Sequence, residues 1–176
     1  MTNDSVTTHD SAMTDDRAWK AACTVTDPEL PMLTLQDLGV LRHVETSADG
    51  VIVWITPTYS GCPAMATMRD DLGYVLQQAG FADVEIRVQL SPPWSSDDMT
   101  ARGKRRLAEA GISPPGTREK RERAVTLTLQ ATRRVLACPR CGSQQTQIIT
   151  EFGAAPCKAL YRCDDCQESF EHFKEI

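Results

Sequence analysis

Four cysteines in the last quarter of the chain have the types and spacing of a metal site. Cys138-Pro-Arg-Cys141 and Cys163-Asp-Asp-Cys166 are two C-x2-C knuckles separated by 21 residues. Each knuckle presents two thiolates on one tight turn, and two such turns complete the tetrahedral four-sulfur shell that Zn²⁺ prefers. We therefore predict a structural zinc bound by these four cysteines. A closed four-thiolate shell leaves no coordination position for catalysis.

Two alternatives remain open at this site. Cys157 lies six residues before Cys163 and could replace one ligand or stay free; four ligands from the knuckles is the simplest arrangement. The metal could also be an iron-sulfur cluster, because thiolates hold both. Two symmetric knuckles that close one small ribbon favour zinc.

A single cysteine elsewhere, Cys62, is the best candidate for reactive chemistry. Pro63 suits the first position of a helix, because its missing N–H would be unpaired there and its φ is already helical. Cys62 is thus predicted at or beside the N-cap, where unpaired N–H groups and the helix dipole favour thiolate over thiol. The alternative is a small buried hydrophobic residue at a strand-helix junction.

The elements that would position Cys62 predict a small α/β domain. Alternating apolar residues predict strands at 40–45 and 51–55, joined by a turn at 48–50, and a third strand at 83–90. Apolar residues at helical spacing predict a helix over 63–80. The order strand, strand, helix, strand predicts a small open mixed sheet covered by helices.

Other segments predict further elements. A short helix begins near Thr14 and ends before Pro28, and a second runs from Ser95 or Ser96 to Gly111. Strand character recurs at 124–130 and, between the knuckles, at 146–150 and 158–162, which is typical of a β zinc ribbon.

Four regions of the chain follow from these patterns. Residues 1–13 are polar and predict a disordered tail. Residues 14–115 predict the α/β domain, 116–134 a basic linker with a strand, and 135–176 the C-terminal four-cysteine zinc ribbon.

Composition indicates a cytoplasmic protein. The 176 residues are 41% hydrophobic, which suffices for a core, and no apolar run approaches the roughly 18 residues of a membrane span. The first residues lack the basic and apolar regions of a signal peptide, so the thiols are expected to be reduced.

The net charge of -5 is unevenly distributed. Residues 1–100 carry -10, residues 101–134 carry +7 and residues 135–176 carry -2. A basic middle between acidic ends suggests docking on an acidic partner or contact between the chain's own modules. A solvated helix face and linker is the alternative.

Several segments resemble known families. DPELPMLTLQDLGVLR (27–42) and ITPTYSGCPA (55–64) are similar to the signature of iron-sulfur cluster assembly factors of the SufT type and of the cytosolic iron-sulfur targeting subunit of eukaryotes. SPPWSSDD (91–98) and EFGAAPCKALYRCDDCQESFEHFK (151–174) resemble the PaaD family, the D component associated with the bacterial 1,2-phenylacetyl-CoA epoxidase. Together the matches cover about residues 15–176.

The resemblance implies an accessory subunit without catalysis of its own, in aerobic phenylacetate degradation. The implied partners are a di-iron oxygenase subunit and a reductase that carries flavin and an iron-sulfur centre. The implied role is to install or maintain iron or clusters in these partners. The family's reactive cysteine falls on Cys62 and its acidic segment on Asp27 and Glu29; with Thr58 and Ser60 they form the predicted functional pocket.

One cysteine cannot hold a cluster alone. A transient iron or iron-sulfur cluster at Cys62 would need a homodimer that pairs two such sites, or a ligand from a partner. The chain is not itself the oxygenase, because its three histidines, at positions 9, 43 and 172, form no Glu-x-x-His pairs of a di-iron site.

Two other functions fit parts of the sequence. A nucleic-acid-binding or regulatory zinc-ribbon protein is the main alternative, since residues 102–134 are basic. The acidic chain and the absence of aromatic residues from this run oppose it, so neither nucleic acid nor membrane is expected as a partner. Thiol redox catalysis by Cys62 ranks lower, because no resolving cysteine lies nearby in sequence.

Overall fold

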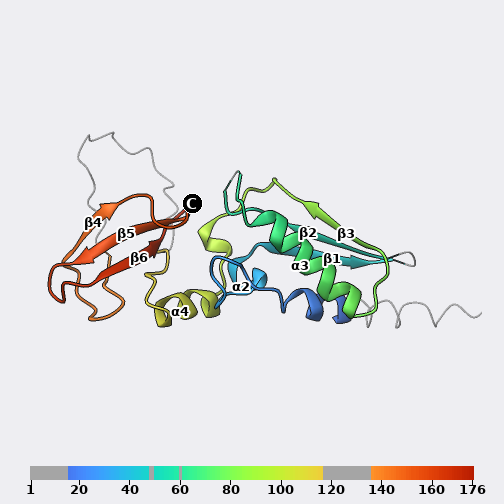
Figure 1. The fold of residues 1–176 in the computed structure, drawn as a ribbon, viewed down its shortest axis with the longest axis horizontal. Helices are drawn as coiled ribbons and strands as arrows, with labels where there is room; N and C mark the ends of the chain where they lie inside the picture. The colour runs from blue at the N-terminus through green and yellow to red at the C-terminus, as the bar shows by residue number, and fades with distance from the viewer. Residues whose placement is uncertain (1–15, 48–49, 60, 117–135) are drawn as a thin grey trace, which may run out of the picture. The chain divides into compact units, whose positions relative to one another are not determined.

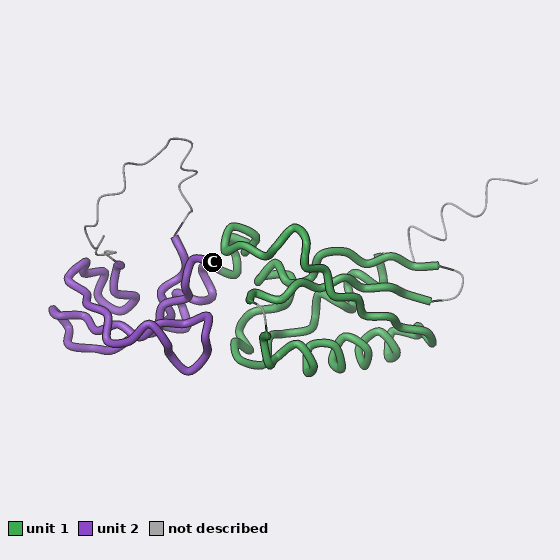
Figure 2. The backbone as a smooth tube through the Cα atoms, turned by 90° about the horizontal axis from the view of Figure 1, so that it is seen from above, with its two compact units in different colours: residues 1–103 green, residues 104–176 purple. Residues whose placement is uncertain are grey.

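The computed structural model describes residues 16–47, 50–59, 61–116 and 136–176. The chain divides into two compact units, residues 1–103 (unit 1) and residues 104–176 (unit 2), shown in Figure 2. The predicted tail, the predicted strand at 124–130, almost all of the linker at 116–134, and Ser60 lie outside the described residues. The predicted domain boundaries stay predictions.

Unit 1 contains a three-stranded mixed sheet in the order β1-β2-β3. Strands β1 (Leu41–Thr46) and β2 (Val51–Ile55) are antiparallel neighbours, as predicted for a hairpin. The helix α3 (Met65–Gln78) then returns the chain to β3 (Val84–Val88), which runs parallel to β2 at the edge of the sheet (Figure 1). The prediction of a small open mixed sheet with helices is confirmed.

The core of unit 1 follows from the two periodicities in its sequence. Every second residue of β2 is buried, and Met68, Leu72 and Leu76 of α3 are buried at helical spacing. Complete burial of one such side chain stabilises the fold by roughly 1.5–3 kcal/mol. The intervening β2 residues Ile52 and Trp54 point to the other face of the sheet and stay partly exposed.

The segment before β1 is irregular but packed. A helix spans 16–22, and a four-residue helix α2 (Leu35–Leu38) follows the two prolines. The Thr34 side chain accepts a hydrogen bond from the Asp37 N–H and so caps α2. Leu30 and Leu33 are buried, which agrees with the apolar character of this stretch.

The predicted helix after β3 is interrupted. A 3₁₀ turn η1 (Ser96–Asp98) is followed by extended backbone at Met99, and only then by α4 (Ala101–Glu109). Ser95 and Asp98 form a reciprocal capping box at η1. Of the two predicted capping residues, Ser95 caps η1 rather than the helix α4, and the prediction of a single uninterrupted helix was wrong.

Unit 2 contains an antiparallel three-stranded ribbon in the order β4-β5-β6. The strands are β4 (Thr146–Thr150), β5 (Lys158–Cys163) and β6 (Ser169–Phe173). The first two agree with the sequence prediction; β6 was missed. Ser113 extends the ribbon beyond β6, because its N–H donates to the Glu171 carbonyl at 2.8 Å and its carbonyl accepts from the Phe173 N–H at 2.9 Å.

In the described part of the chain, no helix combines the length and apolar character that crossing a membrane requires.

Candidate metal and thiol sites

The four knuckle cysteines converge at one end of the ribbon in unit 2. Cys138 and Cys141 lie on the turn before β4, Cys163 ends β5, and Cys166 lies on the turn before β6. Gly142 closes the first knuckle: its N–H donates to the Cys138 carbonyl at 2.8 Å, and its φ of 77° is a conformation that glycine adopts without strain.

The spacing of the four sulfur atoms suits one metal ion. All four lie within 4.8 Å of one another, with Cys138 Sγ 3.8 Å from Cys166 Sγ and Cys141 Sγ 3.6 Å from Cys163 Sγ. Tetrahedral zinc with Zn–S bonds of about 2.3 Å requires sulfur atoms about 3.8 Å apart. A multi-iron cluster places several irons and sulfides between the thiolates and would hold them further apart. The donor set therefore fits structural zinc.

The four thiols also shift one another's pKa. The backbone N–H of Cys166 is the largest cause that lowers the pKa of Cys163, to about 7. A backbone hydrogen bond from Ser143 favours the Cys141 thiolate, but desolvation and the neighbouring thiols raise the pKa of Cys141 to about 12. Four thiolates this close repel one another, so all four lose their protons only when a cation balances them.

Apolar side chains surround the buried half of this site. Cys138 and Cys163 pack in a cluster with Ala159, Tyr161 and Phe170, and the two aromatic rings stack with centroids 5.9 Å apart. Cys157 is buried as well but does not belong to the group of four sulfurs. The group is therefore complete without it.

Cys62 lies in the loop between β2 and α3 of unit 1, but not at the helix cap. The helix begins at Met65, and Ala64 occupies the N-cap position without a side-chain cap. Pro63 belongs to the turn before the helix rather than to its first helical position. The predicted position was wrong by two residues, because the chain makes an additional turn between Gly61 and the helix.

The surroundings of Cys62 raise its pKa. Burial is the largest cause, a hydrogen bond from the Ala64 N–H opposes it, and the carboxylates of Asp27 and Glu29 raise the pKa further; a hydrogen bond with Tyr59 lowers it. The expectation of a stabilised thiolate was therefore wrong. Cys62 is a half-buried thiol that stays protonated near neutral pH.

The predicted pocket residues occupy different environments. Asp27 is buried, and its Oδ1 accepts hydrogen bonds from the backbone N–H groups of Glu29 and Leu30, each at 2.8 Å. Glu29 is exposed. Thr58 is buried in the loop before Cys62, and its contribution to the pocket stays a prediction.

The thiol site is not a complete ligand set. Both carboxylates lie close enough to Cys62 to affect its pKa. Within the described residues, however, the knuckle cysteines are the one group of at least three His, Cys, Asp or Glu side chains whose ligand atoms are close enough for a metal ion. A metal at Cys62 would need ligands from elsewhere.

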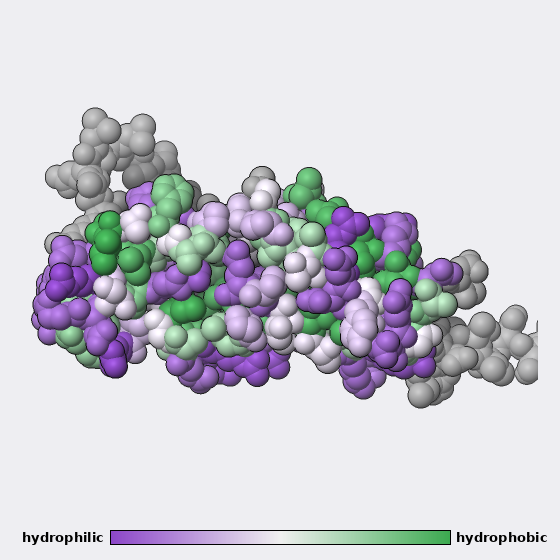
Figure 3. Space-filling view, in the orientation of Figure 1, coloured by the Kyte–Doolittle hydropathy of each residue, from purple (hydrophilic) through white to green (hydrophobic). Residues whose placement is uncertain are grey.

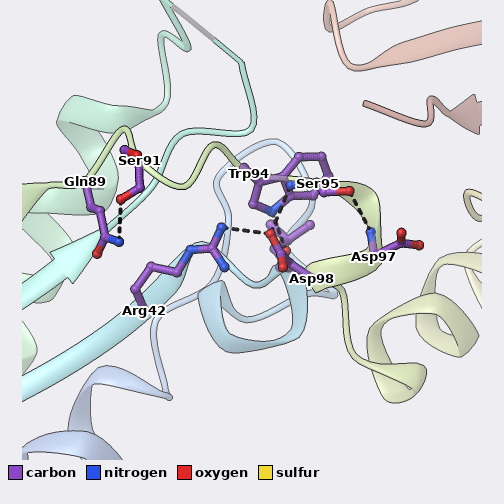
Figure 4. Close-up of polar contacts among 8 residues, drawn as sticks. Arg42, Gln89, Ser91, Trp94, Ser95, Asp97 and Asp98 are labelled. Atoms are coloured by element: carbon purple, nitrogen blue, oxygen red, sulfur yellow. Dashed lines mark hydrogen bonds and ion pairs between the residues drawn. The ribbon is translucent and has the colours of Figure 1, made fainter. Parts of the chain in front are cut away.

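Sequence reasoning missed a polar junction that joins residues 94–103 to α2 and β1, drawn in part in Figure 4. The Arg42 guanidinium donates to the Asp98 carboxylate at 2.8 Å, and Trp94 Nε1–H donates to the Leu38 carbonyl at 2.9 Å. Gly39 makes the close approach possible: a Cβ there would lie 2.5 Å from the Asp98 carbonyl oxygen. SPPWSSDD is thus a structural segment of unit 1.

Asp37 forms the second half of this junction. Its buried carboxylate accepts hydrogen bonds from Arg102 at 2.7 Å, Thr100 at 2.8 Å and Thr34 at 3.1 Å. Burial raises the pKa of Asp37, but these three bonds outweigh it, so the net pKa lies below the usual range. The bonds from Thr100 and Arg102 join residues more than sixty positions apart, and the only sequence signal for them was the acidic and basic residues themselves.

Two family models match this chain. Residues 16–88 match the iron-sulfur cluster assembly protein model, and residues 122–174 match the PaaD zinc beta ribbon domain. A solved structure from Bacillus anthracis, a domain of unknown function named DUF59, covers 56% of this chain and 95% of its own with a TM-score of 0.53 and 24% identity. This likeness shows the fold of unit 1.

Two relatives extend the comparison. The Fe-S protein maturation auxiliary factor SufT of Staphylococcus aureus (strain USA300) is 35% identical over 78 residues, 43% of this chain and 88% of that protein. An Escherichia coli K12 protein, provisionally named as the D component of 1,2-phenylacetyl-CoA epoxidase, is 40% identical over 158 residues, 90% of this chain and 91% of that protein. The likeness to the second extends over both units. The chain therefore belongs to the PaaD family, with an iron-sulfur assembly domain followed by a zinc ribbon.

Proposed function

We propose that this chain is an accessory subunit of a phenylacetyl-CoA epoxidase, without catalysis of its own, that assists the assembly or maintenance of iron or iron-sulfur cofactors in the oxygenase and reductase subunits. Support comes from the relative named as the D component of the epoxidase and from the assembly domain in residues 16–88. The first likeness supports membership of a multi-subunit epoxidase, and the second supports an auxiliary role in cofactor assembly.

One observation carries the proposal: Cys62 is a thiol with an incomplete ligand set. A resident metal would require a group of ligands around it, and the described residues supply such a group only at the knuckles. A protonated thiol beside two carboxylates suits temporary contact with iron, because an arriving cation both displaces the thiol proton and is attracted by the negative charges. The remaining ligands would come from the client subunit.

In this proposal the two units have separate tasks. The ribbon holds structural zinc through Cys138, Cys141, Cys163 and Cys166, and provides a rigid module for contact with other subunits. Unit 1 carries Cys62, the thiol that would bind iron temporarily, with Asp27, Glu29, Thr58 and Ser60 in the predicted pocket.

The first experiment measures metals. Zinc and iron are determined in the chain purified alone, and iron in the oxygenase and reductase produced with and without it. We expect one zinc per chain, no iron retained by the chain alone, and lower iron occupancy in at least one partner when the chain is absent. Unchanged iron in both partners would contradict an assembly role.

The second experiment tests the thiol. Cys62→Ser is expected to lower iron loading of the client and epoxidase activity in cells by about tenfold or more, while zinc content stays at one per chain. Cys23→Ser is the matched control, because Cys23 is also a partly buried thiol of unit 1 whose pKa burial raises. Equal loading by Cys62→Ser and the parent chain would rule out the proposed role of Cys62.

A further inference from the structure

The edge strand β3 of unit 1 has features of an interface. It has one strand neighbour, β2, among the described residues, so its other edge offers unpaired backbone groups. The three large hydrophobic side chains of unit 1 that are most exposed all belong to α3 or to β3 and the residues directly after it: Tyr74 (64%), Val88 (44%) and Leu90 (69%). Figure 3 shows apolar surface, in green, over this part of unit 1.

The hydrogen bonds to β2 determine which backbone groups of β3 point outward. Val51 N–H donates to the Asp83 carbonyl at 2.9 Å, and Gln89 N–H donates to the Ile55 carbonyl at 2.8 Å. In a parallel ladder, alternate residues direct both backbone groups to the same side. The backbone groups of Glu85 and Arg87 therefore point toward β2, as those of Asp83 and Gln89 do. The N–H and C=O groups of residues 84, 86 and 88 point to the free edge.

The sequence of β3, Val-Glu-Ile-Arg-Val, is complementary to itself when reversed. Antiparallel pairing with a second copy about Ile86 places Val84 opposite Val88 of the other copy. It also places Glu85 opposite Arg87, in both directions. The residues that would exchange hydrogen bonds in this register are 84, 86 and 88, the same three whose backbone groups point outward, and they would form about six bonds.

Neighbouring registers are disfavoured. A shift that keeps the hydrogen-bonding phase moves the twofold axis to Glu85 or to Arg87, so that two glutamates or two arginines lie directly opposite each other. Any shift of the axis that exchanges the faces would place the apolar side of one strand beside the charged side of the other. One register thus satisfies backbone, charge and apolar pattern together.

We propose that two copies of this chain form a homodimer through antiparallel pairing of β3, which joins their sheets into one six-stranded sheet. Glu85 and Arg87 already bond within one strand, with Nε–Oε1 and Nη2–Oε2 distances of 2.7 Å, so both charged groups lie at the surface beside the proposed axis. The twofold axis makes the interface self-complementary and closed, which limits the assembly to two chains. This inference depends on unit 1 alone and is independent of the proposed function.

The experiment uses sedimentation velocity over a concentration series of the full chain. The parent chain is expected to dimerise. Glu85→Arg and Arg87→Glu each replace two attractive pairs by two repulsive ones, so each is expected to weaken the dimer by at least about tenfold. The double variant Glu85→Arg/Arg87→Glu restores both pairs with their signs exchanged and is expected to dimerise again.

Mixing provides the sharpest test. Glu85→Arg carries two arginines on β3 and Arg87→Glu carries two glutamates, so the two weakened variants are expected to form a mixed dimer when combined. Asp71→Arg on the exposed side of α3 is the control, with the same change of charge, and should dimerise like the parent chain. Circular dichroism confirms that each variant is folded.

Three results would overturn the proposal: a parent chain that stays monomeric, a dimer that both single variants leave unchanged, or weakened variants that neither recombine nor regain affinity in the double variant. A monomeric parent chain whose β3 becomes protected only in complex with an epoxidase subunit would instead identify that subunit as the occupant.

Discussion

The two sulfur sites of this chain differ in the number of possible ligands that the described residues supply, and this difference underlies the separate roles that we propose for them. Two tight turns of the ribbon supply four thiolates around one point, which is the full set of ligands for a tetrahedral ion. The loop at Cys62 has one thiol, raised in pKa by burial and by two carboxylates. A complete shell suits a permanently bound ion, whereas in the proposed function a metal at Cys62 takes its further ligands from another molecule.

The largest expected effect comes from removing the ribbon's metal. Structural zinc contributes on the order of 10 kcal/mol of binding free energy to small domains, so Cys163→Ser or a strong chelator should unfold unit 2 and leave unit 1 folded. Zinc content and hydrogen exchange of 136–176 measure this. Cys157→Ser is the control and should retain one zinc. Loss of zinc from that control would mean that Cys157 is a ligand.

Acid should affect unit 2, which holds the ribbon, before it affects unit 1. Metal binding requires the four cysteines as thiolates, so protons compete with the ion and zinc should be released as pH falls below neutral. The release is monitored with a zinc-sensitive dye, and circular dichroism monitors the fold. Simultaneous loss of structure in both units would contradict their independence.

An intermediate effect is expected at Asp37, which stabilises unit 1 without metal. Asp37→Asn removes the negative charge to which Arg102 and two threonines donate hydrogen bonds. The free energy of unfolding should fall by about 1–3 kcal/mol, a range that allows for solvent screening because the Arg102 side chain is half exposed. The folded pKa of Asp37 is lowered, so its contribution is present above its unfolded pKa and is lost as pH falls through the lower folded value. Urea titrations at neutral and acidic pH measure the loss of stability in the variant and its dependence on pH.

The matched control for Asp37 is Asp16→Asn, which removes an exposed ion pair with Lys20 and should change stability by less than about 0.5 kcal/mol. If Asp37→Asn were equally harmless at neutral pH, the junction would not be a source of stability for unit 1.

The smallest effect is expected at Glu29. This exposed carboxylate raises the pKa of Cys62, so Glu29→Gln should lower that pKa and increase the rate of Cys62 alkylation near neutral pH by about twofold or more. Mass spectrometry after timed labelling gives the rate, with Cys23 as the internal reference. A slower reaction would show that Glu29 does not act on the thiol through its charge.

The ribbon was predictable from sequence because its chemistry is local. Two residues between cysteines suffice to place both sulfurs on one turn, so spacing alone identifies Cys138 and Cys141 as a pair. The strands of unit 1 were predictable for a similar reason, since alternation within 51–55 is a property of adjacent residues. Strand β6 was missed because its five residues include only two large apolar side chains.

The thiol site was less predictable because its properties depend on tertiary structure. Pro63 correctly indicated a helix nearby, but whether the helix starts there or two residues later depends on how the loop packs. The pKa of Cys62 is raised and not lowered as predicted, because burial and two carboxylates from residues 27–29 outweigh the hydrogen bond from Ala64. The Arg42–Asp98 pair, 56 positions apart, has no local signal at all.

The buried position of Trp94 has a consequence for spectroscopy. All three tryptophans of the chain, at positions 19, 54 and 94, belong to unit 1, and Trp94 is buried with its indole N–H bonded to the Leu38 carbonyl. Intrinsic tryptophan fluorescence therefore reports on unit 1 alone, and a red shift of its emission would indicate that residues 94–103 have separated from α2. The chain thus carries its own optical probe for one of its two halves.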